Sequence, residues 1–124
     1  MKIRISNPFF SLTFILAWTV AQNAFAEGVL IKGEPEDKAQ LSQFDGKLNF
    51  WFSGNVSERD PSLIVVNSRG QRVDNHDVKL DIASRSHLRA TTPKLPPDHY
   101  VIRYRVVTED GLVVSGIRKF SITQ

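Results

Sequence analysis

Residues 95–116, LPPDHYVIRYRVVTEDGLVVSG, decide the fold of this 124-residue chain. Apolar and charged side chains alternate with a period of two over residues 100–107, which is typical of a β-strand with one buried face. The turn residues Asp110 and Gly111 follow, and a second strand-like run begins after them. The stretch therefore predicts a turn, a long strand, a tight loop and the approach to a last strand.

The beginning of the same stretch predicts a tyrosine corner. A leucine, a proline turn and a tyrosine at the start of a long strand (residues 95–100) are typical of that motif. Its phenol hydroxyl bonds back to upstream backbone where the chain crosses between sheets. We therefore expect Tyr100 to have a structural role.

The rest of the chain contains further short runs with strand composition, separated by turn residues. In residues 46–53, Leu48, Phe50 and Phe52 are expected to face one way, and the intervening side chains, Trp51 among them, the other. The remaining expected strands are 29–31, 62–67, 72–73, 78–82, 87–92 and 116–123. Because no run has sustained helical spacing, the pattern predicts a β-sandwich or a small barrel.

The N-terminus has the pattern of a secretory signal peptide. Lys2 and Arg4 precede an apolar run over residues 9–20, and Ala24-Phe25-Ala26 follows as a cleavage site. The apolar run is shorter than the roughly 20 residues of a membrane span. We therefore predict a signal peptide over 1–26 and one mature domain over 27–124, which is periplasmic and does not itself span the membrane.

Composition excludes several classes of function. The chain has 16 basic and 13 acidic residues, and two of the basic ones precede residue 27. The near-neutral charge of the mature domain therefore gives no indication of nucleic-acid binding, which normally shows a basic patch, and we predict no nucleic-acid partner. The chain has no cysteine for a disulfide or a thiolate site, and its only methionine, Met1, lies in the predicted signal peptide. No sequence motif of a hydrolase or phosphate-binding enzyme occurs, so we predict no enzymatic activity.

Several stretches resemble the CopC family of periplasmic copper-resistance proteins: residues 27–35, 48–53, 55–58, 67–70 and, most closely, 95–122. The resemblance covers nearly the whole mature chain. It implies an all-β, immunoglobulin-like Greek-key β-sandwich of about seven strands. It also implies a protein that binds copper or delivers it, with an inner-membrane copper transporter of the CopD type as its partner.

The resemblance also implies where copper would bind. In the family, Cu(II) is bound by the amine and side chain of an N-terminal histidine, by an aspartate, and by the histidine of an Asp-Gly-His loop. Here the terminal amine belongs to Glu27, the aspartate is Asp110, and Leu112 occupies the place of the loop histidine. The implied metal residues are therefore Glu27 and Asp110. Because two imidazole nitrogens of the family site are absent, we expect these residues to bind Cu(II) far more weakly than that site does.

The same resemblance leaves a second function open. The methionine-rich loop that holds Cu(I) in the family corresponds to residues 60–77, which contain no methionine. His76, His87 and His99 share no metal-binding spacing. The chain is thus a copper protein or a metal-free sandwich that acts as a protein-interaction module. Trp51 either covers a sheet edge or forms an exposed interaction hot spot.

Overall fold

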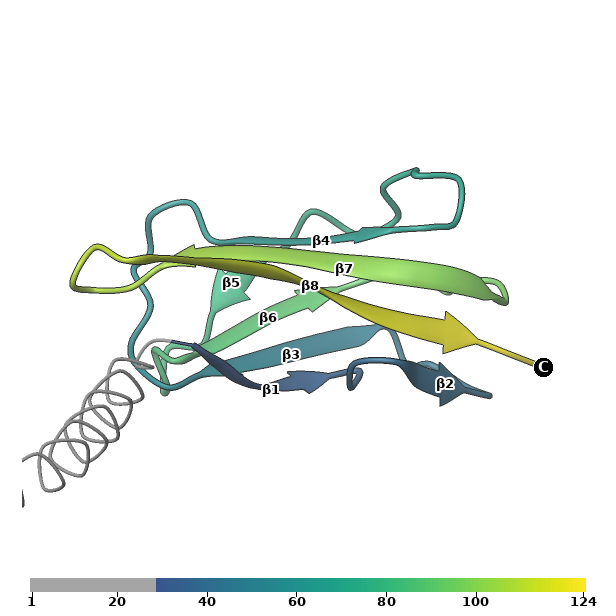
Figure 1. Ribbon diagram of the computed structural model, residues 1–124, viewed down its shortest axis with the longest axis horizontal. Coiled ribbons are helices and arrows are strands. Elements are labelled where there is room, and N and C mark those ends of the chain that lie inside the picture. Colours follow the sequence, from purple (N-terminus) through teal and green to yellow (C-terminus); the bar gives the residue numbers. More distant parts are fainter. Residues whose placement is uncertain (1–28) are drawn as a thin grey trace, which may run out of the picture.

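Two four-stranded sheets form the protein in a computed structural model that describes residues 29–124 (Figure 1). One sheet has the order β1-β3-β6-β5 and the other β2-β8-β7-β4. The strands are β1 Leu30–Glu34, β2 Ala39–Leu41, β3 Lys47–Phe52, β4 Ser62–Val66, β5 Lys79–Leu80, β6 His87–Thr91, β7 Asp98–Val107 and β8 Val113–Ile122. No helix occurs in this part of the chain. The all-β class and the two-sheet sandwich are therefore confirmed, with eight strands where about seven were predicted.

The core lies between the two sheets and follows the predicted alternation. Leu48, Phe50 and Phe52 of β3 are buried, as are Tyr100 and Ile102 of β7. These side chains pack with those of the facing strands into one cluster, which also contains Val56, Leu63, Val65, Leu88, Ala90, Val106, Phe120 and Ile122. Because side chains alternate between the two faces of a strand, local patterns identified the core residues of β3 and β7.

The predicted tyrosine corner is present where β7 begins. The Tyr100 hydroxyl donates a hydrogen bond to the Pro96 carbonyl, and the ring stacks on Phe120 with 5.2 Å between centroids. Burial, with a smaller contribution from the negative charge of Asp98, raises the pKa of Tyr100. The hydroxyl therefore stays protonated and able to donate its hydrogen bond.

Two predicted boundaries were wrong. The strand expected over residues 78–82 contains only Lys79–Leu80, and Ile82 is 99% exposed. The chain turns at Asp81, whose carboxylate accepts a hydrogen bond from the Ala83 amide at 3.2 Å. The last strand begins at Val113, three residues before the predicted start at 116.

Residues 39–41 form β2, a strand that the sequence analysis did not predict. After the cis Glu34–Pro35 peptide bond the chain leaves the sheet of β1 and enters the other sheet as β2. This short strand runs parallel to β8, with Ala39 paired to Phe120 and Leu41 paired to Ile122. The pairing joins residues far apart in the chain, so no local pattern indicated it.

Candidate functional site

The hairpin between β7 and β8 holds Asp110, the predicted metal residue in the described part of the chain. Thr108 is 5% exposed, and its amide donates to the Leu112 carbonyl at 2.8 Å. The Gly111 amide donates to the Thr108 carbonyl at 3.0 Å, and Gly111 has a φ of +91°, which favours glycine. The Asp-Gly turn predicted from the sequence is therefore formed.

Thr108 also fixes the Asp110 carboxylate. The Thr108 hydroxyl donates a hydrogen bond to Oδ1 of Asp110 and accepts one from the Leu112 amide at 3.0 Å. Asp110 itself is exposed to solvent. Within residues 29–124 no hydrogen bond reaches its Oδ2 atom, so this oxygen is available to a ligand. The sequence analysis did not single out Thr108; its spacing, two residues before the aspartate, was the available signal.

The start of the described chain lies at the same end of the sandwich as this hairpin (Figure 1). The Val29 amide donates to the Ser53 hydroxyl at 3.1 Å, and the Ser53 amide donates to the Val29 carbonyl at 2.9 Å. Two residues further along, the Asn55 carbonyl accepts a hydrogen bond from the Glu109 amide at 3.2 Å. The segment 53–55 thus connects the chain start to the hairpin.

Glu27, the second predicted metal residue, lies outside the described residues, as does the signal peptide predicted over 1–26. Its approach to Asp110 stays a prediction. Residues 29–124 contain no group of three or more His, Cys, Asp or Glu side chains that could hold a metal ion. The described residues therefore do not form a complete copper site, and Asp110 is the only predicted ligand among them.

None of the three histidines completes a site with Asp110. His99 bonds Ser121 across the β7–β8 pairing at 2.9 Å, close to the tyrosine corner. His76 is exposed in the loop that follows Asp74 and has a φ of +58°. His87 is half-buried on β6 and uses both ring nitrogens within the fold.

The surroundings of His87 form a polar cluster that sequence reasoning missed. Its Nε2 lies 2.9 Å from Asn49 Oδ1 and its Nδ1 lies 3.3 Å from Asp81 Oδ2. The ring stacks on Trp51 at 4.6 Å, and the Lys32 ammonium lies 5.0 Å from the Trp51 ring. Trp51 therefore covers the outer face of its sheet with neighbours on both sides. These partners come from three strands and a turn, so no local spacing indicated them.

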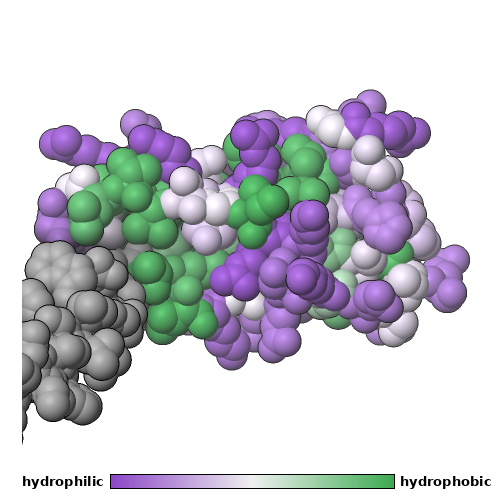
Figure 2. Space-filling view, viewed as in Figure 1, coloured by the Kyte–Doolittle hydropathy of each residue, from purple (hydrophilic) through white to green (hydrophobic). Residues whose placement is uncertain are grey.

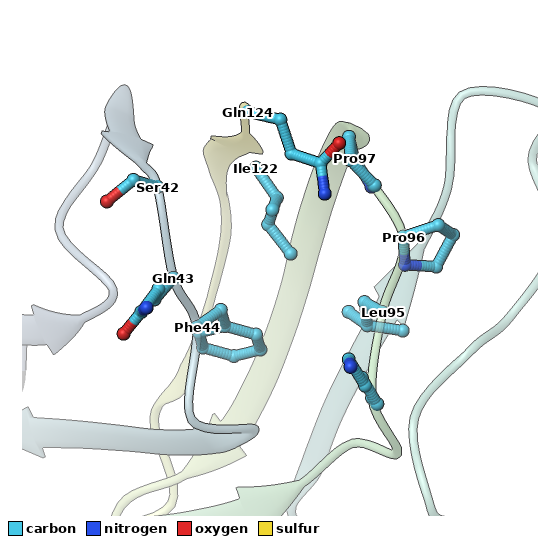
Figure 3. Close-up of a pocket in the computed structure, with 9 residues that line it drawn as sticks. Ser42, Gln43, Phe44, Leu95, Pro96, Pro97, Ile122 and Gln124 are labelled. Carbon is cyan, nitrogen blue, oxygen red and sulfur yellow. The ribbon is translucent and has the colours of Figure 1, made fainter.

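A shallow pocket lies at the opposite end of the sandwich (Figure 3). Phe44, Leu95 and Ile122 face a common space of about 680 Å³, beside Pro96 and Pro97 of the tyrosine corner. The only charged side chain in its lining is Lys94. The described side chains of this lining therefore include no carboxylate or imidazole that could bind a metal ion.

The protein is a β-sandwich, and the groups that a ligand could reach lie on loops at the ends of its two sheets. The CopC domain model matches residues 30–123, and the chain belongs to the CopC family. The sequence resemblance is thereby confirmed. Among residues 29–124 no helix is long and apolar enough to cross a membrane.

Known relatives support this assignment. The copper transport protein CutJ of Bacillus subtilis (strain 168) is 28% identical over 119 residues, which are 94% of this chain and 22% of that protein. The chain therefore spans about a fifth of the length of this curated relative.

Solved structures confirm the immunoglobulin-like Greek-key sandwich. CopC from Methylosinus trichosporium OB3b has a TM-score of 0.72 at 24% identity, over 77% of this chain and 93% of that one. PcoC, a methionine-rich copper resistance protein from Escherichia coli, has a TM-score of 0.64 at 17% identity, over 79% of this chain and 100% of that one. Unlike a methionine-rich protein, this chain contains Met1 alone.

Proposed function

We propose that this chain is a periplasmic copper-homeostasis protein of the CopC type, which binds copper ion as cargo or delivers it to a membrane transporter of the CopD type. Membership of the CopC family carries the proposal. The similarity to a copper transport protein supports it, and the signal-peptide pattern of residues 1–26 supports export.

Two groups of the chain would bind Cu(II). The Asp110 carboxylate is presented with one oxygen held by Thr108 and the other free to bind. The terminal amine of Glu27 would supply a nitrogen ligand after cleavage. Glu27 lies two positions before Val29, which is at the hairpin end, so the Cα atoms of the two residues are at most about 7 Å apart. One amine and one or two carboxylates match the nitrogen and oxygen preference of Cu(II).

A Cu(II) titration tests this proposal on protein that the cell has processed from the full chain. The d–d absorption band and competition with a chelator should reveal a dissociation constant below about 1 µM. Asp110→Ala should abolish this binding, whereas Asp45→Ala, at another exposed aspartate with one local hydrogen bond, should leave it intact. A dissociation constant weaker than about 0.1 mM would contradict the copper proposal.

A gain of function tests the assignment of the two ligand positions. Glu27→His together with Leu112→His restores the two imidazoles of the family site. Cu(II) affinity should then rise at least about a thousandfold, since imidazole suits copper better than carboxylate does. The titration measures this change directly. An unchanged affinity would mean that residues 27 and 112 do not face one metal ion.

The second candidate function is a metal-free interaction module. It is favoured by the lack of any three-ligand group among residues 29–124 and by Leu112 in the hairpin. Protein that binds no Cu(II) in the titration, while keeping its fold, would support this function over copper binding.

A further inference from the structure

The outer edge of β8 is open along most of its length. On one side β8 pairs with β7 from Val113 to Ile122. On the other side β2 pairs only with residues 120–122. Among residues 29–124 no strand pairs with this edge over residues 113–119. We call residues 113–117 the free edge.

Every second residue of the free edge points its backbone amide and carbonyl away from β7. The Lys119 amide donates to the Asp37 carboxylate at 2.9 Å, and its carbonyl accepts from the Lys38 amide at 2.6 Å, both on the β2 side. Since backbone direction alternates along an antiparallel strand, the amides and carbonyls of Val113, Ser115 and Ile117 point the same way. Among residues 29–124, these amides and carbonyls are not paired with another strand.

The facing strand gives an independent check of this direction. Val107 is the β7 partner of Val113, and its carbonyl accepts a hydrogen bond from the Ser57 amide at 2.7 Å. Ser57 lies outside the β7–β8 pairing, next to the bridge between Val56 and Thr108. Val107 and Val113 are therefore a pair that does not exchange hydrogen bonds, and the Val113 groups point outward.

The opposite edge of the same sheet is covered at Val65. At the edge strand β4 the Val65 amide donates to the Asp74 carboxylate at 3.0 Å, and the Val65 carbonyl accepts from the Val73 amide at 2.8 Å. In the other sheet, β1 has an irregular register between Leu30 and Lys32, and β5 contains two residues. Short strands, bulges and charges of this kind protect edges against pairing, and residues 113–117 have none of them.

Exposed aliphatic side chains gather beside the free edge. Large hydrophobic residues with high exposure are Val29, Ile31, Ile82, Leu112, Val113 and Ile117, and all except Ile82 belong to β8, the hairpin or the start of β1. Figure 2 shows apolar side chains over both layers at the hairpin end, whereas polar ones cover the other end. An edge with unpaired backbone and exposed aliphatics is a template for an added strand.

We propose that the free edges of two copies of this chain pair antiparallel, with Ser115 opposite Ser115 of the second copy, to join two sheets into one. Three pairs of residues would then exchange hydrogen bonds, because Val113 lies opposite Ile117 on each side of the two-fold axis. Each outer pair places Val113 opposite Ile117, both of which are β-branched. The two small Ser115 side chains face each other at the two-fold axis.

Charge complementarity favours a second copy as the occupant. In this register Lys119 of each copy lies opposite Gly111 of the other, beside the acidic hairpin residues Glu109 and Asp110. Opposite charges thus meet at both ends of the paired segment, which adds attraction and fixes the register. The pairing needs no copper ion, so it does not depend on the function proposed above.

Sedimentation measurements with a chelator present test the pairing on protein processed from the full chain. We expect a reversible dimer with a dissociation constant on the order of 0.1 mM, since a short edge buries a small interface. Ile117→Lys should raise this constant about tenfold or more. Ile82→Lys, the same change at another exposed isoleucine, should leave it unchanged. A protein that stays monomeric up to about 1 mM overturns the proposal, as does a dimer that both variants leave intact.

A single-cysteine variant tests the register, because the chain has no cysteine of its own. Paired residues at the axis have Cα atoms about 5.5 Å apart, within the reach of a disulfide. Ser115→Cys should therefore form a disulfide-linked dimer on mild oxidation, and Ile82→Cys should stay monomeric. Equal cross-linking of the two variants, or none in Ser115→Cys, overturns the register.

Discussion

The two ends of the β7–β8 ribbon differ in what their side chains contact. At the corner end Tyr100 and Phe120 are buried, stack on each other and anchor the turn through Pro96. At the hairpin end Leu112 and Val113 are more than half exposed, and Asp110 faces solvent. Side chains at the corner end thus stabilise the fold, whereas side chains at the hairpin end can be replaced without disturbing the core. A leucine at position 112, where the family resemblance predicts a histidine, is therefore compatible with an intact sandwich.

Two carboxylates show the same contrast. Asp74, beside β4, has a side chain only 1% exposed and bonds Arg72 at 2.9 and 3.0 Å. Burial by itself would raise the pKa of Asp74, but hydrogen bonds from Arg72 and from the Val65 and His76 amides hold it below its usual value. Asp110 accepts one hydrogen bond at the molecular surface. The first carboxylate is therefore structural, and the second is free for binding.

The largest difference in stability should appear when one apolar side chain is removed at each end of the ribbon. Phe120 is 1% exposed and contacts both Tyr100 and Phe44, whose ring centroid lies 5.0 Å away. Phe120→Ala should therefore lower the free energy of unfolding by about 3–5 kcal/mol. Leu112→Ala should change it by less than about 0.5 kcal/mol. Urea unfolding of both variants measures these values, and similar losses at the two ends would contradict the comparison.

A smaller difference in stability should appear when Asp74 and Asp110 are each neutralised. Asp74→Asn should cost about 2 kcal/mol, because it weakens charged hydrogen bonds in a buried place. Asp110→Asn, the same change at the surface, should cost little. Since the folded pKa of Asp74 lies below the unfolded value of about 3.9, its stabilisation is complete above that pH and is lost as the pH falls through the folded pKa.

The advantage of the native protein over Asp74→Asn should therefore shrink below about pH 4. Urea unfolding at several pH values measures this advantage. Asp77, Asp81 and Asp98 also have lowered pKa values, so the variant keeps part of its sensitivity to acid. An advantage that stays constant from neutral pH to pH 3 would show that the ion pair with Arg72 contributes nothing.

The fold was predictable from sequence where its signals are local. Alternation identified β3 and β7 with the correct buried faces, and the proline turn before Tyr100 identified the corner. β2 was missed because three residues pair with a strand at the far end of the chain. Ile82 was misplaced because alternation alone cannot show that Asp81 starts a turn.

The candidate site was predictable only in part, for the same reason. The Asp-Gly turn located Asp110, but the hydroxyl of Thr108 that holds its carboxylate became visible in three dimensions. The contacts of His87 with Asn49 and Trp51 arise from strand pairing between β3 and β6. Edge exposure of β8 likewise depends on which strands pair with it, so periodicity indicated the strand but not its free side.

The smallest difference in stability concerns the hydroxyl groups of two tyrosines on β7, of which Tyr100 lies at the corner and Tyr104 in the middle of the strand. Tyr100→Phe removes the hydrogen bond to the Pro96 carbonyl and should lower the free energy of unfolding by about 1 kcal/mol. Tyr104→Phe should cost less, because Tyr104 is half-buried and solvent can take the place of its hydroxyl. Thermal or urea unfolding at neutral pH compares the two. Equal losses would mean that the ring of Tyr100, and not its hydroxyl, holds the corner.

Measurements at high pH test the contribution of the Tyr100 hydroxyl proton to stability. The folded pKa of Tyr100 is raised, so the stabilisation that its protonated hydroxyl provides is complete below the unfolded value of about 10 and is lost as the pH rises through the folded pKa. Tyr100→Phe has no proton to lose there, so the gap between native protein and variant should close above about pH 10. Both proteins keep the stack of the ring at position 100 on Phe120, so a gap that persists at higher pH would mean that the proton of the Tyr100 hydroxyl does not contribute to the anchor of the corner.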